Sequence, residues 1–172
     1  MSLLNDASGG KRVLEGMLIA VGTGFGLGTL PLAPGTFGSL LGLPLAWWLL
    51  RYPLAIQAFL AVLLIAVAIS LCHYAALAVG GGDPSQIVAD EFLLFPLAVF
   101  GLQAARNPWV MASALLLFRL FDILKPPPIH WVESWPGGLG IVADDALAAL
   151  CTWVVMAGLL QLRRWQLKRT GQ

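Results

Sequence analysis

The chain has 172 residues, 59% of them hydrophobic and only 11% charged, and its mean hydropathy is +0.83. This composition excludes an ordinary soluble domain, in which about a quarter of the residues are charged, and predicts an integral membrane protein with one domain over 1–172. The net charge is +1 and basic residues cluster only in the tail, which argues against a nucleic-acid-binding protein.

The first dozen residues, 1–12, are polar and are expected to remain on the chain, because no small-residue cleavage site follows them. The apolar stretch 13–30 comes next and runs into 22-GTGFGLGTLPLAPGTFGS-39, which is too rich in glycine and proline for a regular helix. Irregular backbone at membrane depth persists only where protein buries it or where it lines a polar cavity. A broken or re-entrant element is therefore expected here.

Five largely apolar segments follow, and each is predicted to be a helix because strand-like alternation is absent. The expected spans are Ser39–Leu50, Leu54–Val79, Ile87–Gln103, Pro108–Leu124 and Ile141–Leu162. The predicted fold class is all-α, a polytopic membrane bundle of five to six helices. The basic tail 163–172 is expected to contact anionic lipid headgroups.

The acidic residues are distributed on one side of this predicted bundle. If each helix crosses once, the segments 31–39, 80–91 and 119–145 lie at one membrane face, and every acidic residue except Asp6 and Glu15 falls in them. Asp83 and Glu133 are expected to be solvated loop residues. The others are predicted to share a layer about one helical turn deep: Asp90, Glu91, Asp122, Asp144 and Asp145.

Crowded carboxylates repel one another unless protons or a cation neutralise them, and oxygen-only ligands select a hard divalent ion. These five residues are therefore predicted to be both catalytic residues and ligands of Mg²⁺. Structural interpretations stay open: the Asp144 and Asp145 pair could charge a helix start, and Asp122 could form an ion pair within its own helix. Asp90 and Glu91 could be solvated charges at the interface.

Two cations, Arg119 and Lys125, accompany the acidic layer in 119-RLFDILKPPPIHW-131. Arg119 and Asp122 share a helix face, and the prolines after Lys125 must end that helix. Arginine offers a planar fork to phosphate and lysine a mobile charge. Carboxylates for a metal ion with these two cations beside them are the groups that phosphoryl chemistry requires.

Two glycine loops add further groups for an anion. The segment 34-PGTFGS-39 supplies backbone amides and the hydroxyls of Thr36 and Ser39, and 136-PGGLG-140 leads directly into a helix N-terminus. His130 lies in the loop after the prolines and is a candidate proton donor to a leaving oxygen. Together these residues predict a site for a phosphate monoester.

Four stretches now stand out in order along the chain: 24-GFGLGTLPLAPGTFGS-39, 88-VADE-91, 118-FRLFDILKPPPI-129 and 137-GGLGIVADD-145. Together they resemble the motifs of the bacterial phosphatidylglycerophosphatase A family, over about 22–150 of this chain. The resemblance implies a helical, multi-pass protein of the bacterial cytoplasmic (inner) membrane. It also implies Mg²⁺-dependent hydrolysis of phosphatidylglycerophosphate to phosphatidylglycerol in phospholipid biosynthesis. By this likeness the five carboxylates fall on acidic motif positions, and Arg119 and Lys125 on basic ones.

The predicted function is that of a lipid phosphatase, and direct attack by water is favoured because neither a C-x5-R loop nor a D-x-D nucleophile motif is present. A phosphoaspartate route stays open. The alternative from another class is a channel or transporter whose acidic layer binds a divalent cation or a proton. That alternative predicts charges through the full thickness of the membrane, whereas the opposite half is nearly bare of them.

The orientation in the membrane has two conflicting indications. The positive-inside rule places Arg51, Arg106 and the basic tail in the cytoplasm, and so predicts a site on the outer face. The resemblance implies a site at the cytoplasmic leaflet. The sequence leaves sidedness, oligomeric state, the number of metal ions and the general base open.

Overall fold

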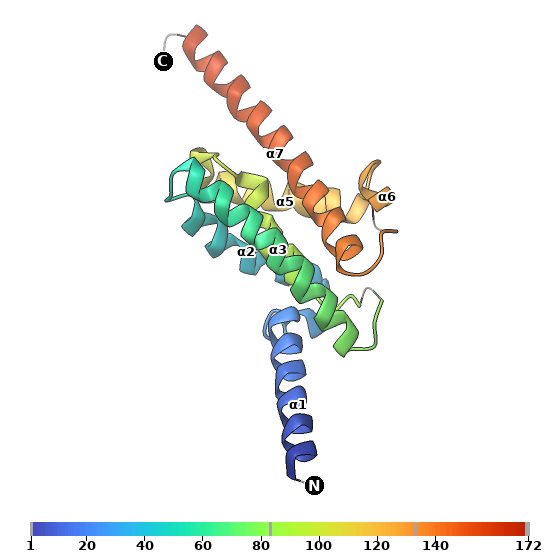
Figure 1. The fold of residues 1–172 in the computed structure, drawn as a ribbon. Coiled ribbons are helices and arrows are strands. Elements are labelled where there is room, and N and C mark those ends of the chain that lie inside the picture. Colours follow the sequence, from blue (N-terminus) through green and yellow to red (C-terminus); the bar gives the residue numbers. More distant parts are fainter. Residues whose placement is uncertain (1, 83, 133, 171–172) are drawn as a thin grey trace.

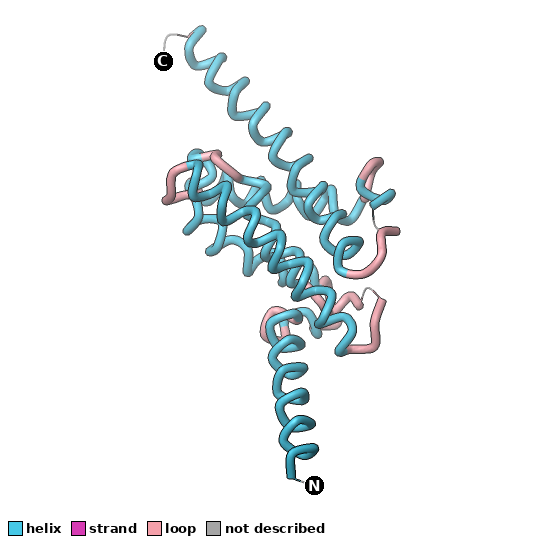
Figure 2. Tube along the Cα trace, viewed as in Figure 1, coloured by secondary structure: helices cyan, strands magenta, loops and turns pink. Residues whose placement is uncertain are grey.

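The computed structural model describes residues 2–82, 84–132 and 134–170. The predictions for Asp83 and Glu133 therefore lie outside the described residues. Helices and their connecting turns account for the described chain, with no strand in these ranges (Figure 2). The all-α fold class is confirmed, and five of the helices are 16 to 32 residues long.

The long helices are α1 (Ser2–Gly22), α3 (Leu54–Ala78) and α7 (Gly138–Arg169). The shorter α-helices are α2 (Pro34–Leu49), α4 (Ala89–Leu94), α5 (Pro108–Leu124) and α6 (Ile129–Val132), and the 3-10 helices are η1 (Leu27–Thr29), η2 (Phe95–Val99) and η3 (Gln103–Arg106). Figure 1 shows α2, α3, α5 and the first half of α7 packed together. The N-terminal part of α1 and the C-terminal half of α7 project from this bundle in opposite directions.

Two described helices, α3 and α7, are long and apolar enough to cross a membrane. A crossing needs about 20 residues, and α3 has 25 and α7 has 32. The outward side of α3 is apolar, and Phe59 and Val62 are each 68% exposed. An exposed apolar surface of this kind is typical of contact with lipid or with another protein, and it supports membrane association.

The predicted helix Ile87–Gln103 is wrong, because the structure breaks it twice. Helix α4 ends at Leu94, and Pro96 follows inside η2, where its missing amide hydrogen cannot continue an α-helical hydrogen-bond ladder. Gly101 then turns the chain with a φ of 69°. Phe95 and Pro96 are buried, so protein covers this irregular segment, as irregular backbone at membrane depth would require.

The N-terminal element is broken as predicted, and the break lies after Gly22, within the expected 13–30. Helix α1 begins at Ser2, includes the polar segment 1–12 from that residue on, and continues to Gly22. Gly24 and Gly26 then adopt left-handed φ values of 57° and 91°, which glycine allows without strain. The Val88 amide donates to the Gly22 carbonyl at 2.9 Å, so this turn is fixed to the residue that precedes α4.

Two helix starts also differ from the prediction. Helix α2 begins at Pro34 rather than Ser39, because proline fits the first position of a helix, where no amide donor is needed. Helix α7 begins at Gly138 rather than Ile141 and continues to Arg169, so most of the basic tail is helical. The bounds of α5 agree with the prediction, and α3 ends one residue before Val79.

Helices α4 and η2 lie at the centre of the bundle, in contact with α2, α3 and α7. Phe95 and Phe118 are fully buried there, with ring centroids 5.7 Å apart in an edge-on arrangement. Alanines at ten of the other core positions let the helix backbones approach closely. Helix α4 therefore lies between α2 and α7, and α7 carries Asp144 and Asp145.

Candidate active site

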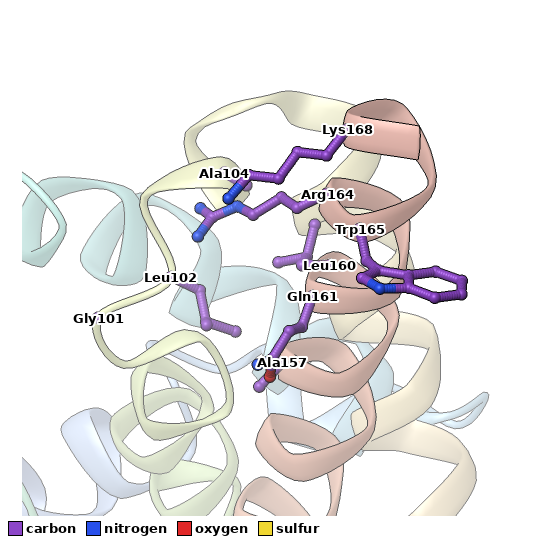
Figure 3. A pocket seen from close by; sticks show the side chains of 9 residues that line it. All are labelled: Gly101, Leu102, Ala104, Ala157, Leu160, Gln161, Arg164, Trp165 and Lys168. Carbon is purple, nitrogen blue, oxygen red and sulfur yellow. The ribbon is translucent and has the colours of Figure 1, made fainter. Parts of the chain in front are cut away.

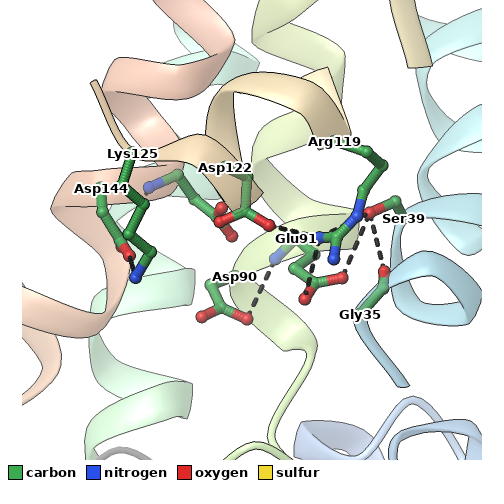
Figure 4. A network of polar contacts seen from close by, with 9 residues as sticks. Gly35, Ser39, Asp90, Glu91, Arg119, Asp122, Lys125 and Asp144 are labelled. Atoms are coloured by element: carbon green, nitrogen blue, oxygen red, sulfur yellow. Dashed lines mark hydrogen bonds and ion pairs between the residues drawn. The ribbon is translucent and has the colours of Figure 1, made fainter. Parts of the chain in front are cut away.

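Charged side chains from three helices converge beside the N-terminal half of α2 (Figure 4). Asp90 and Glu91 lie in the first turn of α4, Arg119 and Asp122 in the last turns of α5, and Asp144 near the start of α7. These residues are as far as 54 positions apart in the chain (90 to 144). The predicted acidic layer is thus present as a structural cluster, while the chemical roles of its members stay predictions.

Arg119 joins two of the carboxylates. Its Nη1 atom lies 2.6 Å from Asp122 Oδ2 and 3.2 Å from Glu91 Oε1, and the side chains concerned are each 14% exposed. The same Nη1 lies 3.5 Å from Ser39 Oγ. In a partly buried setting such charge-assisted bonds are stronger than at the surface, so Arg119 fixes α5 against α4 and α2.

Ser39 is fully buried and faces this pair. Its hydroxyl lies 3.1 Å from Glu91 Oε2 and 2.8 Å from the Gly35 carbonyl, and a hydroxyl has one proton to donate to one of them at a time. Ser39 is therefore a second contact that orients the Glu91 carboxylate.

Lys125 ends α5 and reaches α7. It adopts the left-handed φ of 42° as the C-cap, directly before the three prolines predicted to stop the helix. Its Nζ lies 2.8 Å from Asp144 Oδ2. The predicted helix end is confirmed, and the ion pair brings the second cation into the acidic layer.

Asp145 differs from its neighbour. It is 2% exposed, and neither of its carboxylate oxygens has a hydrogen-bond partner. The charges of Asp90, Glu91, Asp122 and Asp144 all lie near enough to repel that of Asp145. Gly137 caps α7, so the aspartates occupy its second turn, and the interpretation of this pair as charges at a helix start is wrong.

Two glycines of α2 let that helix approach the site. A Cβ on Gly35 would overlap Glu91 Oε1 and would lie 2.6 Å from Arg119 Nη2. A Cβ on Gly38 would lie 2.9 Å from Glu91 Oε2 and 2.6 Å from the Val88 Cβ. The expectation that 34–39 forms a loop of exposed amides is wrong, because these residues form the first turns of α2.

These glycines are the site-forming residues that the sequence analysis missed. A signal was present, because Gly38 and Gly42 have the spacing that small residues show where membrane helices pack closely. A Cβ on Gly42 would lie 2.8 Å from the Phe95 Cβ. The pattern therefore marked the contact of α2 with α4 and η2.

Three further residues have other places. Thr36 lies in the first turn of α2, half-buried, and its amide donates to the Ala33 carbonyl at 2.9 Å. His130 lies in α6, is exposed, and packs its ring 5.6 Å from that of Trp131. In the described ranges no hydrogen bond joins either side chain to the carboxylates. His73 Nδ1 accepts from the Gly138 amide at 3.4 Å and so contacts the start of α7.

The donor set fits a hard cation. Asp145 contributes two buried oxygens without partners, and the carboxylates of Asp90, Glu91, Asp122 and Asp144 lie near enough to act on its charge; oxygen ligands of this kind suit Mg²⁺. Among the described residues, however, no three Asp, Glu, His or Cys side chains already converge as a coordination shell. Glu91, Asp122 and Asp144 form ion pairs with Arg119 and Lys125 instead.

A separate pocket lies at the other end of α7. It has a volume of about 560 Å³ and is lined by Gly101, Gln161, Arg164, Trp165 and Lys168, among others (Figure 3). Arg164 is 20 residues beyond Asp144 (164 − 144), which corresponds to about 30 Å along a helix. No carboxylate lines this pocket, so it cannot be the cation site.

Comparison with known proteins gives one family. The family model described as Phosphatidylglycerophosphatase A matches residues 20–160. A phosphatidylglycerophosphatase A of Escherichia coli is 37% identical over 145 residues, which cover 83% of this chain and 80% of that protein. One from Haemophilus influenzae is 39% identical over 142 residues, covering 81% and 85% respectively.

A third relative, from Bacteroides thetaiotaomicron, carries the provisional name phosphatidylinositol-3-phosphatase. It is 33% identical over 155 residues, covering 86% of this chain and 93% of that protein. No solved structure matches.

Proposed function

This chain belongs to the phosphatidylglycerophosphatase A family, and on that basis we propose that it hydrolyses phosphatidylglycerophosphate to phosphatidylglycerol. It is a phosphatase of lipid phosphate monoesters, an activity that the names of all three relatives share. Two of these names also specify the headgroup proposed here. We further propose that the whole of 1–172 is one multi-pass domain in the bacterial cytoplasmic membrane, and that it acts in phospholipid biosynthesis.

The single observation that carries the proposal is the pairing of an unused donor with unused acceptors in one buried cluster. Arg119 Nε has no hydrogen-bond partner, and neither oxygen of Asp145 has one. A buried polar group without a partner costs about 1–3 kcal/mol. A phosphate oxygen would accept a hydrogen bond from Arg119 Nε, and a cation would bind the Asp145 oxygens. The unpartnered donor and the unpartnered carboxylate therefore support a site for a phosphate together with a metal ion.

We propose that the metal is Mg²⁺ and that Asp145 is its central ligand. Asp90, Glu91, Asp122 and Asp144 are the further candidate ligands, because their charges lie close to Asp145. A bound Mg²⁺ would supply positive charge to the phosphoryl oxygens. Lys125 forms an ion pair with Asp144 in this structure. Its mobile ammonium group would contact both that carboxylate and the phosphate of the substrate.

In the proposed reaction water attacks phosphorus in line with the bond to the glycerol oxygen. That phosphorus–oxygen bond breaks, inorganic phosphate leaves, and the glycerol oxygen takes up a proton. One of the carboxylates Asp90, Glu91, Asp144 or Asp145 accepts the proton of the attacking water. In this proposal Arg119 and Lys125 hold the phosphate, and the hydroxyls of Ser39 and Thr36 on α2 are further candidate phosphate contacts. His130 is the proposed proton donor to the glycerol oxygen.

The test is release of inorganic phosphate from detergent-solubilised protein, with and without Mg²⁺. Three substrates are compared: phosphatidylglycerophosphate, phosphatidic acid and phosphatidylinositol 3-phosphate. Mg²⁺-dependent release that is fastest from the first lipid is the expected result. Faster release from phosphatidylinositol 3-phosphate would show that the proposed headgroup is wrong. No release from any of the three lipids would favour the alternative function, a channel or transporter whose acidic layer binds a cation.

A further inference from the structure

An apolar groove of about 550 Å³ lies between α2 and α5. We propose that it holds one acyl chain of the lipid substrate while the phosphate lies at Arg119. This inference rests on the proposed function, since it takes the substrate to be a phospholipid phosphate. The groove lining is mostly apolar, with Leu40, Leu43 and Pro44 from α2 and Met111, Ala112 and Leu115 from α5.

The groove continues the helix faces that carry the site. On α5, Leu115, Ala112 and Pro108 precede Arg119 by four, seven and eleven positions, which places them on one face of the helix. On α2, Leu43 and Trp47 follow Ser39 by four and eight positions. An acyl chain that leaves a phosphate held at Arg119 and Ser39 would therefore reach the groove along these two helix faces.

One hydrogen bond joins α2 to α5 beyond the site end of the groove, and another joins α2 to η3 at its far end. At the site end Arg119 Nη1 lies 3.5 Å from Ser39 Oγ, and at the far end Trp47 Nε1 donates to the Arg106 carbonyl at 3.3 Å. Between them small or apolar side chains leave space. Arg106 also places its guanidinium carbon 5.9 Å from the centre of the Trp47 ring, so a polar cluster closes the groove.

The distance along α5 from Arg119 to the far end of the groove matches the thickness of one leaflet. Arg119 and Pro108 are eleven residues apart, which corresponds to about 17 Å along α5. Half of a hydrocarbon core about 30 Å thick is about 15 Å. A lipid with its phosphate at Arg119 would thus bring the end of an acyl chain to the Trp47 and Arg106 cluster.

A second apolar groove, of about 400 Å³ between α3 and α7, serves as the comparison. It is lined by Ala58 on α3 and by Ala146 and Leu150 on α7. The face of α7 that carries Asp145 does not lead into this groove. The next residues on that face, Ala149 and Thr152, are fully buried. The groove between α2 and α5 is therefore the one whose lining residues share helix faces with Arg119 and Ser39.

The test compares Ala112→Phe, which fills the proposed groove, with Ala58→Phe, which fills the other; both alanines are exposed, so neither change overpacks a buried position. Phosphate release is measured with dioleoyl and with dihexanoyl phosphatidylglycerophosphate. Ala112→Phe should lower kcat/KM for the dioleoyl lipid about tenfold, chiefly through KM, which corresponds to about 1.4 kcal/mol. Its kcat/KM for the dihexanoyl lipid, and both values for Ala58→Phe, should stay within about twofold of the unsubstituted enzyme.

Equal losses for both lipids, no loss for either, or the same loss in Ala58→Phe would each overturn the acyl-chain assignment while leaving the phosphatase activity established. A second measurement reads binding without turnover. A phosphatidic acid with a photoactivatable group at its acyl terminus should label peptides from 40–47 and 108–115, and unlabelled substrate should compete. Labelling confined to α3 and α7, or labelling that unlabelled lipid does not reduce, would also overturn it, whether or not the headgroup proposal holds.

Discussion

Lys125 Nζ lies 2.8 Å from Asp144 Oδ2, whereas the adjacent Asp145 has no partner for either oxygen. Two consecutive aspartates in one helical turn therefore have opposite electrostatic environments. The charge of Asp144 is balanced by a lysine from the end of α5, while that of Asp145 is surrounded by like charges. Of the two aspartates, Asp145 is therefore the one whose charge a bound cation would stabilise more.

Mg²⁺ should stabilise the folded protein through Asp145. A ligand at about 100 times its Kd stabilises the state that binds it by about 2.7 kcal/mol, so added Mg²⁺ should raise the melting temperature of the solubilised protein. In Asp145→Asn most of that rise should be lost, because the central ligand has no charge. The melting temperature is followed with increasing Mg²⁺ after treatment with a chelator, and an unchanged rise in Asp145→Asn would exclude it as the ligand.

Asp122→Asn should lower kcat at least about 100-fold, because it removes a carboxylate from the proposed metal site and from Arg119. Phosphate release is the readout, and elution of a folded, monodisperse protein in detergent is checked in parallel. Glu15→Gln is the matched control: it also neutralises one acidic side chain, but in an exposed ion pair of α1, and should retain full activity. Preserved turnover in Asp122→Asn would remove this residue from the mechanism.

Arg119→Lys should lower kcat/KM by about 100-fold although the charge is kept. A single ammonium cannot contact Glu91, Asp122 and a phosphate oxygen with the geometry of a guanidinium. Arg163→Lys, in the exposed part of α7, should have no effect. Similar kcat/KM values for the two variants would show that only the charge at Arg119 matters.

Gly35→Ala should reduce activity more than it reduces stability. The added methyl would overlap Glu91 Oε1 and approach Arg119 Nη2, so both side chains must move. Gly158→Ala is the control in another helix, where a Cβ would meet nothing within 4 Å and alanine should stabilise by up to about 1 kcal/mol. Steady-state kinetics and thermal unfolding are measured on both, and normal kinetics in Gly35→Ala would show that the close approach is dispensable.

The sequence predicted well the helices whose ends have strong local signals. Asn107 and Pro108 open α5, and the prolines after Lys125 close it, so both of its bounds were predicted. It failed where a buried proline interrupts an apolar run, as at Pro96, because hydropathy does not distinguish an α-helix from a short 3-10 segment packed in a core.

The cluster itself was predictable because charges are costly in an apolar bundle and must gather. The pairing within it was not. Whether Arg119 contacts Glu91 as well as Asp122, and whether Lys125 reaches Asp144, depends on how closely α4 and α7 approach α5, and that distance is set by packing rather than by local sequence.

The order in which the ribosome synthesises the helices has a consequence for the assembly of the charged cluster. Ser39, Glu91 and Arg119 are all synthesised before α7, so a nascent chain can already pair the arginine with its carboxylate while Asp145 has yet to be made. Asp145, the carboxylate without a hydrogen-bond partner, is thus made after α2, α4 and α5. A chain truncated before α7 would lack both Asp144 and Asp145 and would therefore be inert.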